Sequence, residues 1–156
     1  MVVKDVIEVD YVNYKKPSMI IACPICDFKC DKECGQQICQ NCAIAKQKDI
    51  TIDDDVLINK YLKGSSRSIC FQGLEPFDTS VQMMRFIHKF RQVTNDDVVI
   101  YTGYNKDEIS EQIKSLKQYP NIIIKFGRYI PDQQPHYDEV LGVELASDNQ
   151  YAEKIN

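Results

Sequence analysis

The chain has 156 residues, of which 44% are apolar and 27% are charged, and its formal net charge is −4. This length supports one domain with its own core, so we expect a single domain over residues 1–156. The negative charge argues against a general nucleic-acid binder, because phosphate binding depends on lysine and arginine. The N-terminus lacks a secretory signal, and no apolar run could cross a bilayer. We therefore expect a soluble, cytoplasmic protein that binds neither nucleic acid nor a membrane.

Apolar strand patterns alternate with helical patterns from residue 18 onward. Strands are predicted at "SMIIA" (18–22), "RSICFQG" (67–73), "DVVIYTG" (97–103) and "NIIIKFG" (121–127), and helices at residues 53–64, 80–93 and 106–120. Beyond these, "YDEVLGVELA" (137–146) predicts a turn and a short strand. This alternation predicts an α/β fold, either a partial (β/α) barrel or an open, mainly parallel sheet.

Six of the seven cysteines lie in the loop after the first predicted strand, in the segment "CPICDFKCDKECGQQICQNC" (23–42). In a reducing cytosol, such a density of cysteines indicates metal or redox chemistry rather than disulfides. Three further polar loops follow the other predicted strands, at 72–78, 102–107 and 127–136. Open α/β sheets bind ligands outside the carboxyl ends of their strands, so we expect a functional site where these four loops meet.

The cysteine loop allows two metal-binding interpretations. Two cysteine pairs with the spacing C-x2-C-x12-C-x2-C could form a four-thiolate zinc site, which would use Cys23, Cys26, Cys39 and Cys42. This assignment leaves Cys30 and Cys34 without a role. Alternatively, Cys26, Cys30 and Cys39 could hold a [4Fe–4S] cluster, and three ligands would leave one iron free for a small molecule.

The sequence resembles the radical S-adenosylmethionine (SAM) enzymes, and specifically the activating proteins of anaerobic ribonucleotide reductase, over roughly residues 11–151. The cluster motif of that family is C-x3-C-x2-C, followed by a polar residue and asparagine. Cys26, Cys30 and "CQN" at 39–41 match its two ends, but residues 31–38 replace the usual two between the second and third cysteines. Since Cys34 lies within this longer segment, Cys34 and Cys39 both remain candidates for the third ligand.

Three further segments are similar to those activating proteins. "FQGLEPF" (71–77) resembles their glycine–glutamate loop, although Leu74 replaces its second glycine, and "YTGY" (101–104) and "DNQ" (148–150) resemble a strand end and a C-terminal segment. Leu74 adds a side chain where the backbone of the family approaches SAM. The resemblance implies that Glu75 binds the SAM ammonium group. It also implies further cofactor-binding residues, namely Asn41, Gly73, Pro76, Thr102, Gly103 and Tyr104.

The resemblance implies an enzyme in which Cys26, Cys30 and Cys39 hold a [4Fe–4S] cluster whose fourth iron chelates SAM. One electron would cleave SAM to methionine and a 5′-deoxyadenosyl radical, which would take a hydrogen atom from a glycine of a partner. The implied partners are a glycyl-radical enzyme, such as anaerobic ribonucleotide reductase, and an electron donor such as flavodoxin or ferredoxin. The alternative is a non-catalytic zinc or iron–sulfur module for binding or electron transfer. Cys23, Cys34 and Cys42 could be spare thiols, a zinc site or ligands of a second cluster.

Overall fold

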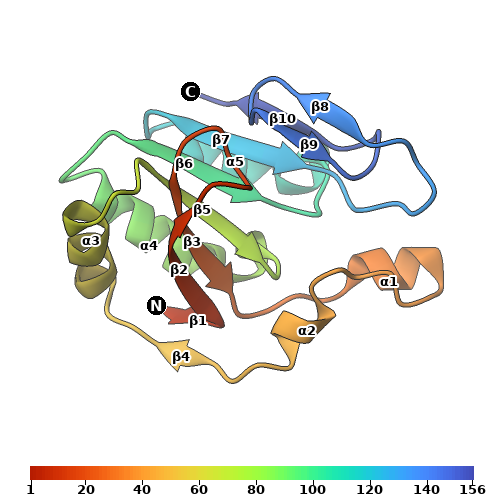
Figure 1. Cartoon of the computed structure of the whole chain (residues 1–156), viewed down its shortest axis with the longest axis horizontal. Coiled ribbons are helices and arrows are strands. Elements are labelled where there is room, and N and C mark those ends of the chain that lie inside the picture. The colour runs from red at the N-terminus through yellow and green to blue at the C-terminus, as the bar shows by residue number, and fades with distance from the viewer.

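The computed structural model describes residues 1–156, which form an α/β structure around one six-stranded sheet (Figure 1). In spatial order the strands are β10 (Tyr151–Lys154), β7 (Ile122–Phe126), β6 (Asp97–Tyr101), β5 (Ser68–Gly73), β3 (Ser18–Cys23) and β2 (Asp5–Asp10). Two short sheets pair β1 (Val2–Val3) with β4 (Ile50–Thr51), and β8 (His136–Asp138) with β9 (Val143–Leu145).

The helices connect the strands or lie in the cysteine loop. They are α1 (Lys29–Cys34), α2 (Cys42–Ala45), α3 (Asp54–Lys63), α4 (Ser80–Phe90) and α5 (Ser110–Leu116), with 3-10 turns η1 (Pro76–Thr79) and η2 (Lys106–Ile109). At the start of α3, the Asp53 side chain accepts a hydrogen bond from the N–H of Asp55, and Gly64 ends the helix. None of these helices is both long and apolar enough to span a membrane.

The four predicted strands are confirmed as β3, β5, β6 and β7, which run parallel to one another. The prediction of an open, mainly parallel sheet is therefore correct, whereas the alternative of a partial barrel is not shown. The two edge strands, β2 and β10, are antiparallel to their neighbours, so the sheet is mixed and ends in strands of opposite direction.

The chain also contains strands that the sequence analysis did not assign. Residues 2–10 form β1 and β2, so the cysteine loop follows the third strand of the chain rather than the first. Strand β2 is an exposed edge whose sequence, "DVIEVD", contains three acids among three apolar residues and lacks the apolar run of a buried strand. After β7, the chain forms β8 and β9 where the sequence predicted a turn and one short strand, and it adds β10, which was not predicted.

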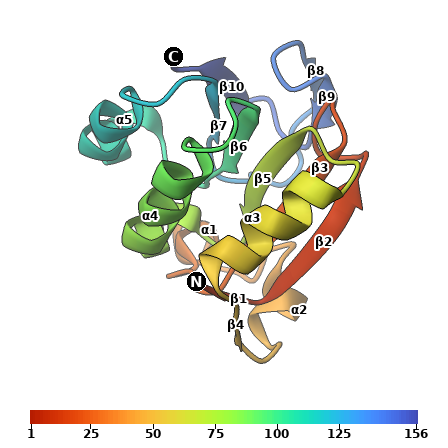
Figure 2. The ribbon, with the colours of Figure 1, turned by 90° about the vertical axis from the view of Figure 1, so that its left-hand side faces the viewer.

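The two faces of the sheet are covered differently. Helices α3, α4 and α5 lie together on one face (Figure 2), where their apolar side chains pack on alternate strand residues such as Ile21, Phe71 and Ile100. The other face carries the smaller cluster, which includes Tyr14, Ile20, Cys70, Val99, Ile123, Leu141, Leu145 and Ala152. Because successive side chains of a strand point to opposite faces, this burial on both sides explains the continuous apolar runs of the central strands.

The packing predicts a large stability cost for truncating Phe86 in α4. Phe86 is fully buried, and its ring lies 5.7 Å from Phe71 and 5.9 Å from Phe90 between centroids. Phe86→Ala should lower the free energy of unfolding by about 3–5 kcal/mol, because it removes the buried ring and leaves a cavity. Denaturant unfolding of the apo-protein measures this, with Val81→Ala as the control in the same helix. Val81 is 84% exposed, so the control should change stability by at most about 0.5 kcal/mol; equal losses would contradict this packing.

Candidate functional site

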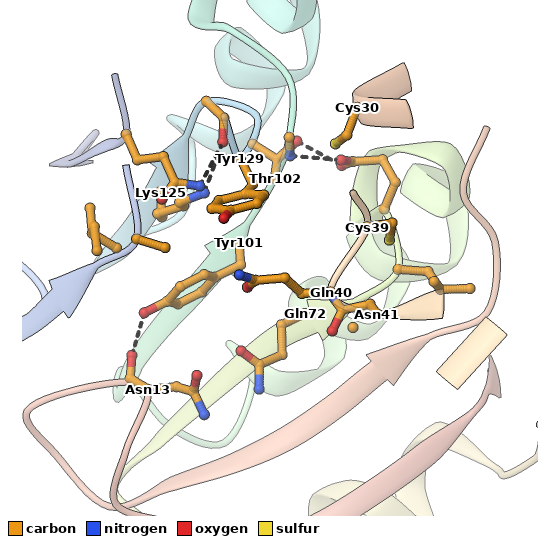
Figure 3. Close-up of a pocket in the computed structure, with 18 of the residues that line it drawn as sticks. Asn13, Cys30, Cys39, Gln40, Asn41, Gln72, Tyr101, Thr102, Lys125 and Tyr129 are labelled. Atoms are coloured by element: carbon orange, nitrogen blue, oxygen red, sulfur yellow. Dashed lines mark hydrogen bonds between the residues drawn. The ribbon is translucent and has the colours of Figure 1, made fainter. Parts of the chain in front are cut away.

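A cavity of about 400 Å³ opens at the carboxyl ends of the parallel strands (Figure 3). Its floor includes Gln72 from β5, Tyr101 from β6 and Lys125 from β7. These residues alternate with strand residues that pack under α3, α4 and α5, so the cavity lies on the sheet face opposite those helices. The β8–β9 hairpin contributes another wall through Val143, Glu144 and Leu145. The volume is within the range of pockets that bind small ligands and cofactors.

Three of the six loop cysteines line this cavity, namely Cys26, Cys30 and Cys39. They are the three that the resemblance implies as cluster ligands. Cys30 and Cys39 lie at one side of the cavity, and Lys125 lies at the other (Figure 3). The remaining loop cysteines, Cys23, Cys34 and Cys42, do not line it.

The cysteine arrangement does not match a four-thiolate zinc site. Tetrahedral coordination with Zn–S bonds of about 2.3 Å places the sulfur atoms about 3.8 Å apart. No three thiols of this chain lie within 4.8 Å of one another; the one such group of possible ligands contains Cys26 with Asp27 and Asp78. Moreover, Cys23 is 2% exposed and belongs to the main core.

The thiols that line the cavity resist ionisation. Burial raises the pKa of Cys26 to about 12, although the N–H of Phe28 donates to its sulfur at 3.3 Å. Burial also raises the pKa of Cys30 and of Cys39. Thiolates are the metal-binding form, so these residues need a cationic partner to release their protons. Three partly buried thiols around one cavity therefore fit an iron–sulfur cluster.

Glu75 joins two of the strand-end loops in the wall of the cavity. Its carboxylate accepts hydrogen bonds from the Thr102 hydroxyl at 2.7 Å, the Gly103 N–H at 2.9 Å and the Phe77 N–H at 3.1 Å. The residue is 7% exposed, and burial raises its pKa to about 7 despite these three donors. Each hydrogen bond favours the anion, but desolvation is the larger effect.

Lys125 is a site residue that the sequence analysis missed. It is 7% exposed, its Nζ donates to the carbonyl of Gly127 at 2.8 Å, and burial lowers its pKa to about 8. Both Lys125 and Gln72 are polar residues near the ends of otherwise apolar strands. That interruption of the apolar run was the available signal, because a polar residue in a buried strand requires a partner.

The structure brings most of the predicted site residues together, but not all. Those lining the cavity are Asn41, Gly73, Glu75, Thr102 and Gly103, together with Leu74 and, from the "DNQ" segment, Gln150. Pro76 begins η1 and is buried outside the cavity. Tyr104 is also outside it, and its hydroxyl donates to Asp78 at 2.7 Å.

Gly73 is required by the approach of two strands. Its φ is +89°, and a Cβ there would lie 3.2 Å from the Cβ of Ala22 in β3. The backbone of this loop therefore lies directly against the neighbouring strand, in a conformation that favours glycine.

These thiols and the sheet around them define an iron–sulfur protein. The sequence model of the 4Fe-4S single cluster domain matches residues 19–150, well over half of the chain. The chain belongs to that family, and its cluster-binding domain is of a type associated with radical SAM proteins. No curated protein and no solved structure matches the chain.

The raised pKa of Glu75 predicts how the stability of the apo-protein depends on pH. In the folded state the carboxyl group of Glu75 has a pKa of about 7, whereas an ordinary glutamate has a pKa of 4.5. The contribution of Glu75 to the free energy of unfolding is therefore fully present below pH 4.5, decreases between pH 4.5 and 7, and is lost above pH 7. The difference corresponds to about 3 kcal/mol.

Denaturant unfolding at pH 5 and pH 8 tests this dependence. The wild type should lose more stability over this interval than Glu75→Gln, which has no proton to release. Glu139→Gln, at an exposed position, should keep the wild-type dependence. The same loss in Glu75→Gln as in the wild type would show that Glu75 does not titrate in this way.

Proposed function

We propose that the protein is a radical SAM activase, which cleaves SAM reductively and installs a glycyl radical on a partner enzyme such as anaerobic ribonucleotide reductase. The observation that carries this proposal is the content of one cavity. Three thiols, a buried carboxylate and a buried lysine line the same space at the strand ends.

The thiols support an open cluster. Cys26, Cys30 and Cys39 supply three ligands, and a [4Fe–4S] cluster with three cysteine ligands retains one iron for another molecule. Asn41 lies beside them in the cavity, and its N–H is close enough to Cys39 to lower the pKa of that thiol in part.

The charged residues support an amino-acid group as the ligand. SAM carries an ammonium and a carboxylate on its methionine part, and the cavity offers one buried group of each opposite sign, Glu75 and Lys125. Burial works against the charge of both residues, raising the pKa of Glu75 and lowering that of Lys125. An ion pair with a zwitterionic ligand would compensate both, and such charge-assisted hydrogen bonds are among the stronger ones in proteins.

When bound and reduced, the cluster would supply one electron to the sulfonium C–S bond of SAM, yielding methionine and a radical that takes a hydrogen atom from the partner's glycine. The electron would come from a donor such as flavodoxin or ferredoxin. The chain itself would hold SAM through Glu75 and Lys125 and limit its contact with water through the β8–β9 hairpin. Its contribution is binding and orientation, while the cofactors carry the reaction.

The cavity mouth supports a protein substrate. Val12, which lines the cavity, is 74% exposed, and the adjacent Tyr11 is 71% exposed. A small domain whose cavity reaches an exposed apolar rim can admit a loop of another protein.

The activase step is tested by incubating the reconstituted protein with SAM, dithionite and anaerobic ribonucleotide reductase, then recording the electron paramagnetic resonance spectrum. A glycyl radical signal that disappears when the acceptor glycine is replaced by alanine supports the step, and its absence counts against this partner.

Substitution of single cysteines tests the ligand assignment. Cys26→Ala, Cys30→Ala and Cys39→Ala should each abolish formation of 5′-deoxyadenosine from SAM, because each removes a cluster ligand. Cys23→Ala and Cys42→Ala should retain it, since neither residue lines the cavity. Product is measured by mass spectrometry after anaerobic reconstitution, beside iron content. Equal loss in the Cys23 or Cys42 variant would show the assignment to be wrong, and a wild-type cluster without SAM cleavage would favour an electron-transfer module.

Replacing Lys125 tests whether this residue binds the carboxylate of SAM. Lys125→Met keeps a long side chain but removes the charge, and should raise the Kd for SAM by about 10–100-fold, the value of one hydrogen bond to a charged group. Equilibrium binding to the reconstituted protein measures this. Lys117→Met removes an equal charge from an exposed position and should leave the Kd unchanged. An unchanged Kd in Lys125→Met would place the SAM carboxylate elsewhere.

A further inference from the structure

The segment between Cys30 and Cys39 is longer than in the proteins that the chain resembles, and almost all of it is in contact with solvent. Residues 32–37 are exposed, and helix α1, which carries Cys30, has no buried residue. Hydrophobic burial therefore does not determine where this segment lies. Its position depends on polar contacts, which can be traced individually.

One set of contacts attaches α1 to the body of the protein. The Nζ of Lys29 lies 3.6 Å from a carboxylate oxygen of Glu108 and 4.2 Å from the ring centroid of Tyr104. Farther along the helix, Glu33 lies 3.3 Å from the Nε of Arg128. The guanidinium of Arg128 is itself fixed by two hydrogen bonds to Glu108, at 2.6 and 2.8 Å. Helix α1, and Cys30 with it, is thus held against η2 and the loop after β7.

A second set of contacts closes the inserted segment on itself. The Oδ1 of Asp31 accepts hydrogen bonds from the N–H groups of Ile38 and Cys39, both at 2.8 Å. Gly35, with a φ of +67°, ends α1 in the left-handed conformation, and the chain turns back from there. Asp31 directly follows Cys30, so the hydrogen bonds of its carboxylate connect the Cys30 end of the segment to the backbone of Cys39.

Cys34 has no comparable contact. It lies four residues beyond Cys30 on α1, about 6 Å farther along the helix axis. Its thiol is exposed and does not line the cavity, whereas Cys39 does. The two candidates for the third ligand therefore differ: Asp31 brings Cys39 back to the cavity, whereas Cys34 is exposed to solvent.

We propose that Asp31 is a positioning residue that selects Cys39, and not Cys34, as the third thiol of the cluster site. The proposal rests on Cys26 and Cys30 being cluster ligands, as in the proposed function. Asp31 performs in this chain what a two-residue spacing would otherwise do: it keeps the second and third thiols at one cavity. Without its carboxylate, two backbone N–H groups lose their acceptor, and the eight residues 31–38 become a free loop whose closure costs conformational entropy.

Two readouts that do not involve SAM test this proposal. The first is hydrogen exchange of the Ile38 and Cys39 amides in the apo-protein, followed by NMR. The second is the iron and sulfide bound after anaerobic reconstitution. In Asp31→Ala the amide hydrogens of Ile38 and Cys39 should exchange at least about 10-fold faster, as expected for loss of a hydrogen bond to a charged group. The variant should also bind less than half the iron that the wild type binds. Since α1 has no buried residue, the variant should keep the wild-type fold and melting temperature.

Three control variants separate positioning from a general effect of charge. Asp31→Asn retains an oxygen acceptor and should recover most of the iron. Asp107→Ala removes an equal charge from an exposed residue with no hydrogen bond or ion pair, and should behave as wild type. Cys34→Ser should leave cluster content unchanged in the wild type but lower it further in Asp31→Ala, if a loosened loop lets Cys34 substitute for Cys39.

The proposal is overturned if Asp31→Ala keeps full iron content, or if Cys34→Ser alone loses the cluster as Cys39→Ala does. A wild-type protein that forms a cluster but does not bind SAM would remove the proposed function and leave the role of Asp31 intact. Conversely, full iron content and SAM binding in Asp31→Ala would remove the role of Asp31 and leave the function intact.

Discussion

All three crossover helices lie on one face of the parallel strands, and this constraint determines where a site can form. Helices α3, α4 and α5 fill the space over one set of alternate strand residues with the main core. The other face has no helix to cover it, and the residues around Tyr14, Leu141 and Leu145 cover part of it instead. Near the carboxyl ends this cover is incomplete, and Gln72, Tyr101 and Lys125 meet a cavity there rather than a packed layer.

Burial imposes the same electrostatic cost on each of the ionisable groups that line the cavity. Its thiols, its carboxylate and its lysine all have pKa values displaced by burial toward their neutral forms. In the absence of ligands, the wall contains groups that are costly to ionise. An iron–sulfur cluster and a zwitterionic ligand would supply opposite charges for each of them. The same cavity would therefore be weakly charged without its ligands and fully paired with them.

Much of the fold could be predicted from sequence, because the four central strands and three helices have strong periodic patterns. The edge strands could not. Strand β2 is an acidic, exposed edge, and β10 follows a segment with weak periodicity. Strand β2 is positioned by pairing with β3, the next strand of the chain, and β10 by pairing with β7 across the two intervening strands β8 and β9.

The site was partly predictable for a similar reason. Motif spacing pointed to Cys26, Cys30 and Glu75, but the polar residue Lys125 could be assigned to the cavity only when the covered face of the sheet was known. The burial of Cys23 likewise follows from the alternation of side chains along β3, because Cys23 lies on the same helix-covered face as Met19 and Ile21. Asp31 gave no sequence signal, because its contacts with residues seven and eight positions later depend on the path of an irregular loop.

The central claim is that this cavity holds a cluster with one iron open to SAM. It is tested most directly by anaerobic reconstitution with iron and sulfide, reduction with dithionite, and electron paramagnetic resonance with and without SAM. The account predicts a reduced-cluster signal whose shape changes when SAM is added. A cluster signal that SAM leaves unaltered, or stoichiometric zinc in place of any cluster, would contradict it.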